Sequence, residues 1–176
     1  MSGSIDNLKR KYDRDMHVEF CKATLPEEAL KLRELDVLLF GSDAFEVDYW
    51  RRLPASYWVS VDHRIVGCTA FSHHTDFQED LREDGENVFQ EGTLYIETTG
   101  ILPEYRGRGL GTCIKRWQVG YARQNGFKRI VTNCRKSNSA IIALNERHGF
   151  SVIRTTEAYY EDPIEATVVM DILLDR

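Results

Sequence analysis

The hydrophobic positions of the N-terminal third predict one strand followed by two helices. Residues 16–23 alternate weakly between apolar and polar side chains, which is the period of a half-buried strand. Residues 24–41 carry helix start and stop signals, among them Thr24 and Glu27, which match the pattern of a capping box. A second, short helix is predicted over residues 45–53.

Three further strands are predicted in the middle of the chain. Residues 56–72 resemble two strands joined by a tight turn at 62–64, and residues 93–102 form the next strand. Between them, residues 73–92 are acidic and weakly periodic, which indicates a long loop of the kind that is usually functional or disordered. Within the strand 93–102 a period of two places four side chains on one face: Tyr95, Glu97, Thr99 and Ile101.

The hydrophobic period becomes helical at Leu110, where an amphipathic helix is predicted to begin. Its apolar face consists of Leu110, Cys113, Ile114, Trp117 and Tyr121. The side chains expected to face the other way are Lys115, Arg116, Gln118, Arg123 and Gln124. The remaining segments are a strand at 127–134, a short helix at 138–149 and closing strands at 150–155 and 166–174. This order predicts an α/β fold with a mixed sheet and helices on both faces.

The length and composition fit one globular domain. A chain of 176 residues can bury roughly 70% of its unfolded surface, so we assign residues 16–176 to a single domain. Residues 1–15 lack the apolar centre of a secretion signal, and we expect a polar leader that can be disordered. No apolar run approaches the roughly 20 residues of a membrane span. We therefore expect a cytoplasmic protein without a membrane partner.

Charge and cysteine content exclude further partners. The formal net charge of −5 gives no basic footprint for nucleic acid. The four cysteines are widely spaced and form no CxxC pair, which favours reduced thiols over a disulfide framework or a zinc site. We therefore expect neither a nucleic-acid partner nor a metal ion. The cysteines are Cys21, Cys68, Cys113 and Cys134.

Glycines and arginines are concentrated between the strand at 93–102 and the helix that follows it. Glycine is costly in regular structure, so this concentration requires a local reason. The first amides of a helix lack intrahelical partners and lie at the positive end of its dipole, so they can hold an anion where no Cβ blocks the approach. The segment therefore predicts a phosphate-binding loop. Its residues are Arg106, Gly107, Arg108, Gly109 and Gly111.

Three phosphate-binding patterns can be compared with this loop. A P-loop fails, because Gly111 is followed by Thr112 and Cys113 and not by Lys and Ser or Thr. A dinucleotide fingerprint is weak, because the glycines come mid-chain and no acidic residue ends the next strand. The third pattern, Arg/Gln-x-x-Gly-x-Gly/Ala, is met by Arg106, Gly109 and Gly111.

This third pattern, preceded by TTGILPEY and followed by NSAIIALNERHGF, resembles the GNAT superfamily of acyl-CoA N-acyltransferases. The resemblance is at the level of motifs over residues 93–150 and extends more loosely to residue 16. It implies a mixed sheet that is splayed between its fourth and fifth strands, with helices on both faces. It also implies acetyl-CoA as the cosubstrate that donates the acyl group.

The resemblance assigns the coenzyme contacts residue by residue. Ile101 and Leu102 would contact the pantetheine arm, and Asn138 matches an asparagine that contacts the same arm. Asparagine is also a good helix N-cap, and both roles can hold at Asn138. The residues expected to hold the pyrophosphate are Arg106, Gly107, Arg108, Gly109, Leu110, Gly111 and Thr112.

Attack of a primary amine on a thioester requires a neutral amine, so a general base is expected. Glu97 lies on the strand face that looks toward the thioester in GNAT proteins, and it is the first candidate for this base. The alternative is a structural or solvent-facing glutamate. His73 and His74, at the end of the preceding strand, are a second candidate because the pKa of histidine is near neutral.

Asn145 departs from the pattern of the family. Many relatives have a tyrosine there that protonates the leaving sulfur, whereas asparagine can orient a group but cannot act as an acid. The proton donor is therefore open among Tyr159, Tyr160, Tyr95 and water.

The resemblance predicts an N-acetyltransferase that moves an acetyl group directly to a primary amine of a small molecule or peptide. The alternatives are an acyl-CoA-binding sensor without turnover and, more distantly, a nucleotide-binding oxidoreductase. The acidic segment 76–91 would attract a cationic acceptor or is simply a solvated surface, and a homodimer stays open. The segments that surround the acceptor in the family contribute Tyr49, Trp50, Trp58, Phe77 and Tyr159.

Overall fold

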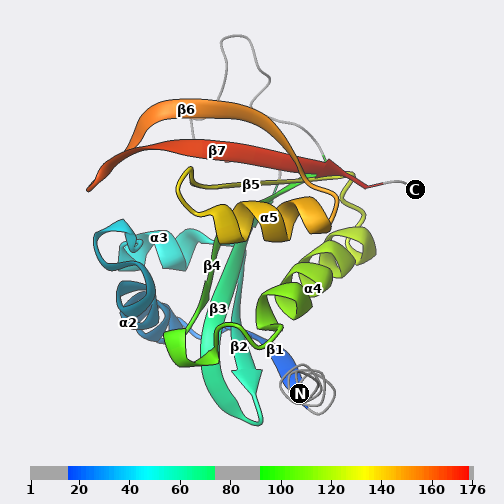
Figure 1. Ribbon diagram of the computed structural model, residues 1–176. Coiled ribbons are helices and arrows are strands. Elements are labelled where there is room, and N and C mark those ends of the chain that lie inside the picture. The colour runs from blue at the N-terminus through cyan, green and yellow to red at the C-terminus, as the bar shows by residue number, and fades with distance from the viewer. Residues whose placement is uncertain (1–15, 74–91, 175–176) are drawn as a thin grey trace, which may run out of the picture.

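One seven-stranded sheet runs through the molecule in the order β1-β2-β3-β4-β5-β7-β6 (Figure 1). The computed structural model describes residues 16–73 and 92–174. The strands are β1 Val18–Lys22, β2 Ala55–Val61, β3 Arg64–His73, β4 Thr93–Ile101, β5 Arg129–Arg135, β6 Ser151–Glu161 and β7 Ile164–Leu173. The helices are α2 Glu28–Phe40, α3 Val47–Arg52, α4 Leu110–Gln124 and α5 Ser139–Arg147, with 3-10 turns at Gly41–Asp43 and Pro103–Tyr105. This order confirms the predicted α/β architecture.

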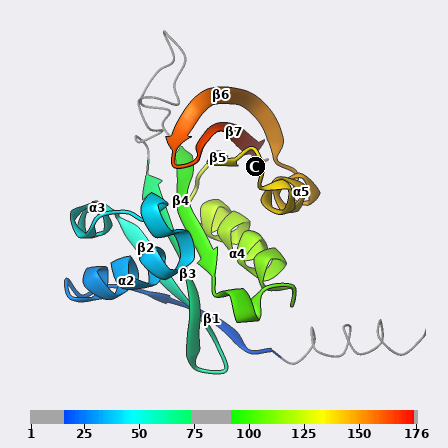
Figure 2. The same cartoon turned by 60° about the vertical axis from the view of Figure 1, so that its left-hand side comes forward.

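Helices cover both faces of the sheet, as the sequence predicts. α2 and α3 lie against one face, and α4 and α5 lie against the other (Figure 2). On the α4 side, Leu94, Ile130 and Met170 are fully buried in the largest apolar cluster. On the α2 side, Leu32 and Trp50 pack against the sheet in a second cluster. The sheet is therefore the middle layer of three.

The sheet splits between β4 and β5, its only parallel pair of neighbours within the described residues. Their pairing runs from Thr93 opposite Arg129 to Ile96 opposite Thr132 and then stops. From Glu97 onward β4 stays paired with β3 but separates from β5 (Figure 1). The predicted splay between the fourth and fifth strands is therefore confirmed, and it opens a cleft through the sheet.

A β-bulge at Glu97 overturns the prediction that four side chains of β4 share one face. The register to β3 slips between Ile96 and Thr98, so Glu97 is the extra residue. Tyr95 packs with Tyr159, and Glu97 accepts a hydrogen bond from a side chain of α3. Beyond the bulge, the alternation is reversed. Thr99 and Ile101 consequently contact α4.

Several element ends differ from their predicted positions. The acid that caps the start of α2 is Glu28, not Glu27, because its carboxylate accepts from the amides of Thr24 and Leu25. The turn between β2 and β3 consists of Asp62 and His63, both with positive φ, which matches a two-residue hairpin. β6 is longer than predicted. The polar leader at residues 1–15 and the acidic segment 76–91 lie outside the described residues.

Candidate active site

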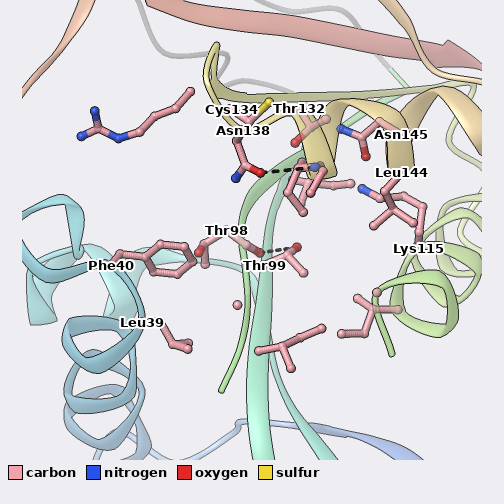
Figure 3. Close-up of a pocket in the computed structure, with 18 of the residues that line it drawn as sticks. Leu39, Phe40, Thr98, Thr99, Lys115, Thr132, Cys134, Asn138, Leu144 and Asn145 are labelled. Atoms are coloured by element: carbon pink, nitrogen blue, oxygen red, sulfur yellow. Dashed lines mark hydrogen bonds between the residues drawn. The ribbon is translucent and has the colours of Figure 1, made fainter. Parts of the chain in front are cut away.

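A cleft of about 810 Å³ opens where β4 and β5 separate. Its walls come from the unpaired half of β4, the end of β5, the loop before α4, and helices α2, α4 and α5. In Figure 3, Phe40 of α2 lies on one side, Thr98 and Thr99 of β4 lie in the middle, and Lys115 and Leu144 lie on the opposite side. The cleft therefore passes through the sheet, with one opening on each face.

The glycine-rich loop presents unpaired amides at one end of this cleft. Gly107 and Gly109 have φ of 73° and 85°, in the left-handed region that other residues rarely adopt. Gly109 directly precedes α4. Among the described residues, the amides from Gly107 to Thr112 have no hydrogen-bond acceptor. Free amides at the positive end of a 15-residue helix favour an anion such as a phosphate group.

Position 111 requires glycine for a different physical reason than positions 107 and 109. A Cβ at Gly111 would lie 3.1 Å from Cδ2 of Leu144, so the glycine permits the close packing of α4 on α5. Gly100 is comparable, because a Cβ there would lie 2.4 Å from Cδ1 of Leu39 on α2. Both glycines therefore permit the close packing of elements that border the cleft.

The structure brings together most of the residues that the sequence predicts. Leu102 is an exception, because its side chain packs with the α2 cluster and its amide donates to the carbonyl of Val66 over 2.8 Å. Arg108 is the other exception, since it is exposed and its guanidinium lies 5.5 Å from the ring centre of Tyr105. The predicted residues that line the cleft are Glu97, Ile101, Arg106, Gly107, Gly109, Leu110, Gly111, Thr112, Asn138, Asn145 and Tyr159.

Two of these residues also shape the cleft entrance. The Nε of Arg106 donates to the carbonyl of Ile101 over 2.9 Å and ties the loop to the end of β4. Asn138 is the N-cap of α5, where its Oδ1 accepts from the amide of Ile141 over 3.3 Å (Figure 3). Its N-cap role leaves the Nδ2 donors of the same side chain for a ligand in the cleft.

Glu97 lies on the α3 side of the cleft. Its Oε2 accepts from the hydroxyl of Tyr49 over 2.8 Å, and its Oε1 accepts from the hydroxyl of Ser72. Two neutral donors orient the carboxylate without supplying a counter-charge. Ser72 was not singled out from the sequence, because a serine in a buried strand has no distinctive pattern.

Tyrosines surround the same side of the cleft. Burial and the nearby Glu97 raise the pKa of Tyr95 well above its ordinary value, and its hydroxyl donates to Asn133. Burial raises the pKa of Tyr160 to about 12. These two side chains therefore stay protonated near neutral pH. Tyr159 and Tyr160 line the cleft, whereas Tyr95 lies behind the wall.

Asn145 is almost completely buried on α5, with 1% of its surface exposed. Its Nδ2 donates to Sδ of Met170 over 3.5 Å, and its Oδ1 has no partner among the described residues. His73, the second candidate base, turns away from the cleft: its Nε2 lies 3.4 Å from the hydroxyl of Tyr121, and its ring packs on Phe127. His74 lies outside the described residues.

Lys115 and Gln118 contradict the prediction of which side chains of α4 face solvent. Both were expected to face solvent, yet only 6% and 0% of their surfaces are exposed, and both line the cleft. Gln118 donates to the hydroxyls of Thr69 and Thr99 and holds α4 against the sheet. Burial lowers the pKa of Lys115 to about 7. The helix has a buried polar stripe because one of its faces borders the split and not the apolar core.

The acceptor-side aromatics divide into two groups. Trp50 and Trp58 are core residues, 3% and 8% exposed, in the cluster under α2. Tyr49 contacts Glu97, and Tyr159 lines the cleft, so these two remain near the predicted acceptor. Phe77 lies outside the described residues.

A split sheet, a glycine loop with free amides and a carboxylate thus meet in one cleft. A model of the acetyltransferase (GNAT) family matches residues 26–150. The chain therefore belongs to the acetyltransferase (GNAT) family.

Similar proteins carry related names. Probable N-acetyltransferase san of Drosophila melanogaster is 31% identical over 91 residues, which are 50% of each chain. N-alpha-acetyltransferase 50 of Danio rerio is 33% identical over 79 residues, or 43% of this chain and 47% of the relative. The chain spans about half the length of the curated relatives it matches.

The structure of NAA60 of Arabidopsis thaliana in complex with acetyl-CoA has the same fold. The TM-score is 0.70 at 18% identity, covering 90% of this chain and 100% of that one. None of the helices in residues 16–73 and 92–174 is both long and apolar enough to cross a membrane. In the same ranges, no group of three or more His, Cys, Asp or Glu side chains could hold a metal ion.

Proposed function

We propose that this protein is an N-acetyltransferase that moves the acetyl group of acetyl-CoA directly to a primary amine. The observation that carries this proposal is the shared cleft: Gly107, the residues 109–112 and Glu97 border one cavity from opposite faces of the sheet. A coenzyme bound by its pyrophosphate at α4 can extend its arm into the split, and an amine can approach from the α3 side.

The residues present fit coenzyme A. The free amides at the start of α4, with Arg106 beside them, suit the pyrophosphate, and Asn138 keeps an amide donor toward the arm. Ile101 supplies backbone at the open edge of β4. A similar structure, that of NAA60, contains acetyl-CoA, which supports the same cosubstrate here.

The chemistry then requires a base on the acceptor side. Glu97 accepts the proton of the amine, directly or through a water molecule, while the amine nitrogen attacks the carbonyl carbon. The thiolate that leaves requires a proton, and Tyr159 stays a predicted donor on this side of the cleft. Holding both reactants in the split supplies the orientation that a bimolecular reaction in water lacks.

We propose a peptide α-amino group as the acceptor. Support comes from a similar protein that is named N-alpha-acetyltransferase 50. The small-molecule acceptor stays the alternative, and the cytoplasmic location and a homodimer stay predictions.

A sensor without turnover is the second candidate function, and Asn145 is the observation that favours it. Its amide cannot act as an acid toward a leaving thiolate, and its Nδ2 donates a hydrogen bond to Sδ of Met170. In a sensor, the loop would still bind acetyl-CoA, but no amine would be acetylated.

Replacing Glu97 by Gln separates the two functions. The change keeps the size and removes the basicity, so we expect kcat to fall by roughly 10²-fold or more. The measurement is thiol release with mass spectrometry, using acetyl-CoA and peptides with free or blocked N-termini beside a polyamine. Glu104→Gln, an exposed site just beyond β4, is the matched control and should act as wild type. Binding of acetyl-CoA without transfer to any amine would identify a sensor.

A further inference from the structure

Lys115 carries an ammonium group that is buried in the wall of the cleft. Its Nζ lies 4.9 Å from the ring centre of Phe150, and only 6% of the residue is exposed. Within the described part of the chain, Lys115 forms no ion pair. Burying an unpaired charge is costly, so its place in this cavity requires a functional reason.

The position of Lys115 follows from its neighbours on α4 and β4. Gln118, three residues further along α4, donates to the hydroxyl of Thr99 over 2.8 Å. This turn of the helix therefore lies beside the half of β4 that has separated from β5. Figure 3 shows the Lys115 side chain in the region of the cleft that Thr132 and Asn145 also border. Its ammonium consequently lies on the α4 side of the split.

Asn145 is a second, independent sign of a ligand at this point. Its Oδ1 is buried, has no partner among the described residues, and belongs to a residue that lines the cleft. A buried acceptor without a partner is expensive unless a bound molecule or water satisfies it. A cationic donor and an unsatisfied acceptor thus border the same region.

We propose that Lys115, and not Tyr159 as the sequence predicts, gives its proton to the coenzyme A thiolate as that thiolate leaves the acetyl group. This inference rests on the proposed function. The bond between the amine nitrogen and the acetyl carbon forms, and the bond between that carbon and sulfur breaks, with the electron pair remaining on sulfur. The sulfur takes a proton from Nζ, Glu97 holds the proton lost by the amine, and solvent later restores both groups.

The acidity of Lys115 suits this step. Burial lowers its pKa to about 7, so a large part of the side chain is still protonated at neutral pH. A thiol has a pKa of about 8.5, so a proton moves downhill from this ammonium to a thiolate. The titratable group that faces Lys115 from β5 is Cys134, and burial raises its pKa to about 11, so it stays uncharged. Asn145 and Phe150 carry no charge.

A titration of bound coenzyme A tests the proposal without an acceptor. Lys115 has largely lost its proton at the pH where a thiol ionises, so a permanent charge at the same position is the probe: Lys115→Arg should lower the pKa of the bound thiol by at least about one unit relative to wild type. The thiolate is followed by its far-ultraviolet absorbance, with desulfo-coenzyme A as the reference that cancels the protein thiols. Lys115→Met removes a buried charge and should fold. Lys115→Gln is the second uncharged variant.

Two controls make the outcome specific. Lys128→Met removes an exposed lysine and should leave the thiol pKa unchanged. Lys115→Met cannot donate a proton, so transfer to a peptide should slow while the thiol pKa stays close to that of wild type. Equal thiol pKa values in wild type and Lys115→Arg, with coenzyme A bound to both by calorimetry, would overturn the proposal. If wild type binds no coenzyme A at all, the proposed function itself fails.

Discussion

At the scale of single residues, Asp36 shows how burial changes the pKa of a carboxyl group. It lies on α2 with 1% of its surface exposed, and its Oδ2 accepts from the amide of Phe45 over 2.7 Å. Burial is the largest cause that raises its pKa from 3.8 to about 6. The carboxylate fixes the connection between α2 and α3, which forms part of the acceptor side of the cleft.

This pKa predicts a pH-dependent effect of Asp36→Asn. A raised pKa means that the folded protein holds a proton that the unfolded chain has lost, so the stability of wild type falls as pH rises from 3.8 to about 6. Asn keeps an acceptor for the Phe45 amide but cannot ionise. We therefore expect the variant to gain about 3 kcal/mol relative to wild type between these pH values, with no further gain above them.

Denaturant unfolding of both proteins from about pH 4 to about pH 8 covers the interval in which the difference should grow and the plateau above it. Asp48→Asn is the control, because Asp48 is exposed and pairs only locally with Arg51 over 2.9 Å. A constant difference between wild type and Asp36→Asn across the range would show that Asp36 is charged at all these pH values.

At the scale of elements, hydrophobic periodicity predicts the order of strands and helices, and the glycine pattern predicts the loop before α4. Periodicity did not predict the bulge at Glu97, because one extra residue in a strand leaves no mark on composition. It also assigned Lys115 and Gln118 to the solvent side of α4, since a polar side chain is usually exposed. These two residues are buried because α4 borders a split in the sheet, which only the paired strands β4 and β5 reveal.

The loop and α4 together predict how acetyl-CoA should stabilise the fold. A ligand at 100 times its Kd raises the free energy of unfolding by about 2.7 kcal/mol. Thr112→Glu places a carboxylate at the third residue of α4, where it competes with the pyrophosphate for the free amides. We expect most of the stabilisation by acetyl-CoA to disappear, as measured by the shift in Tm.

Thr112 is better suited to this test than the glycines. Gly109 has φ of 85°, so any side chain there strains the backbone and weakens the fold. Glutamate in the first turn of a helix is favourable, so the unliganded variant should remain stable. Thr112→Gln is the matched neutral control and should keep the shift. If Thr112→Glu were stabilised as much as wild type, the phosphate would have to bind elsewhere.

At the scale of the whole molecule, Arg135 connects segments that are far apart in sequence. From the end of β5, its Nη2 donates to Asp43, between α2 and α3, over 2.7 Å. The same guanidinium donates to the carbonyls of Asp162 and Pro163 in the β6–β7 hairpin. Its centre lies 4.1 Å from the ring centre of Tyr160. One side chain thus holds two walls of the cleft together on the acceptor side.

The contacts of Arg135 predict an energetic coupling between the two walls. In a double-mutant cycle with Arg135→Gln and Asp43→Asn, we expect a coupling energy of about 1 kcal/mol, because the pair is bidentate and both side chains are partly buried. The single variants should also speed amide hydrogen exchange in the β6–β7 hairpin. The affinity for acetyl-CoA should stay unchanged, because the proposed coenzyme site lies on the α4 side. Arg51→Gln with Asp48→Asn, an exposed pair within α3, is the control cycle and should give less coupling. Additive effects of Arg135→Gln and Asp43→Asn would mean that the two walls are held independently of this ion pair.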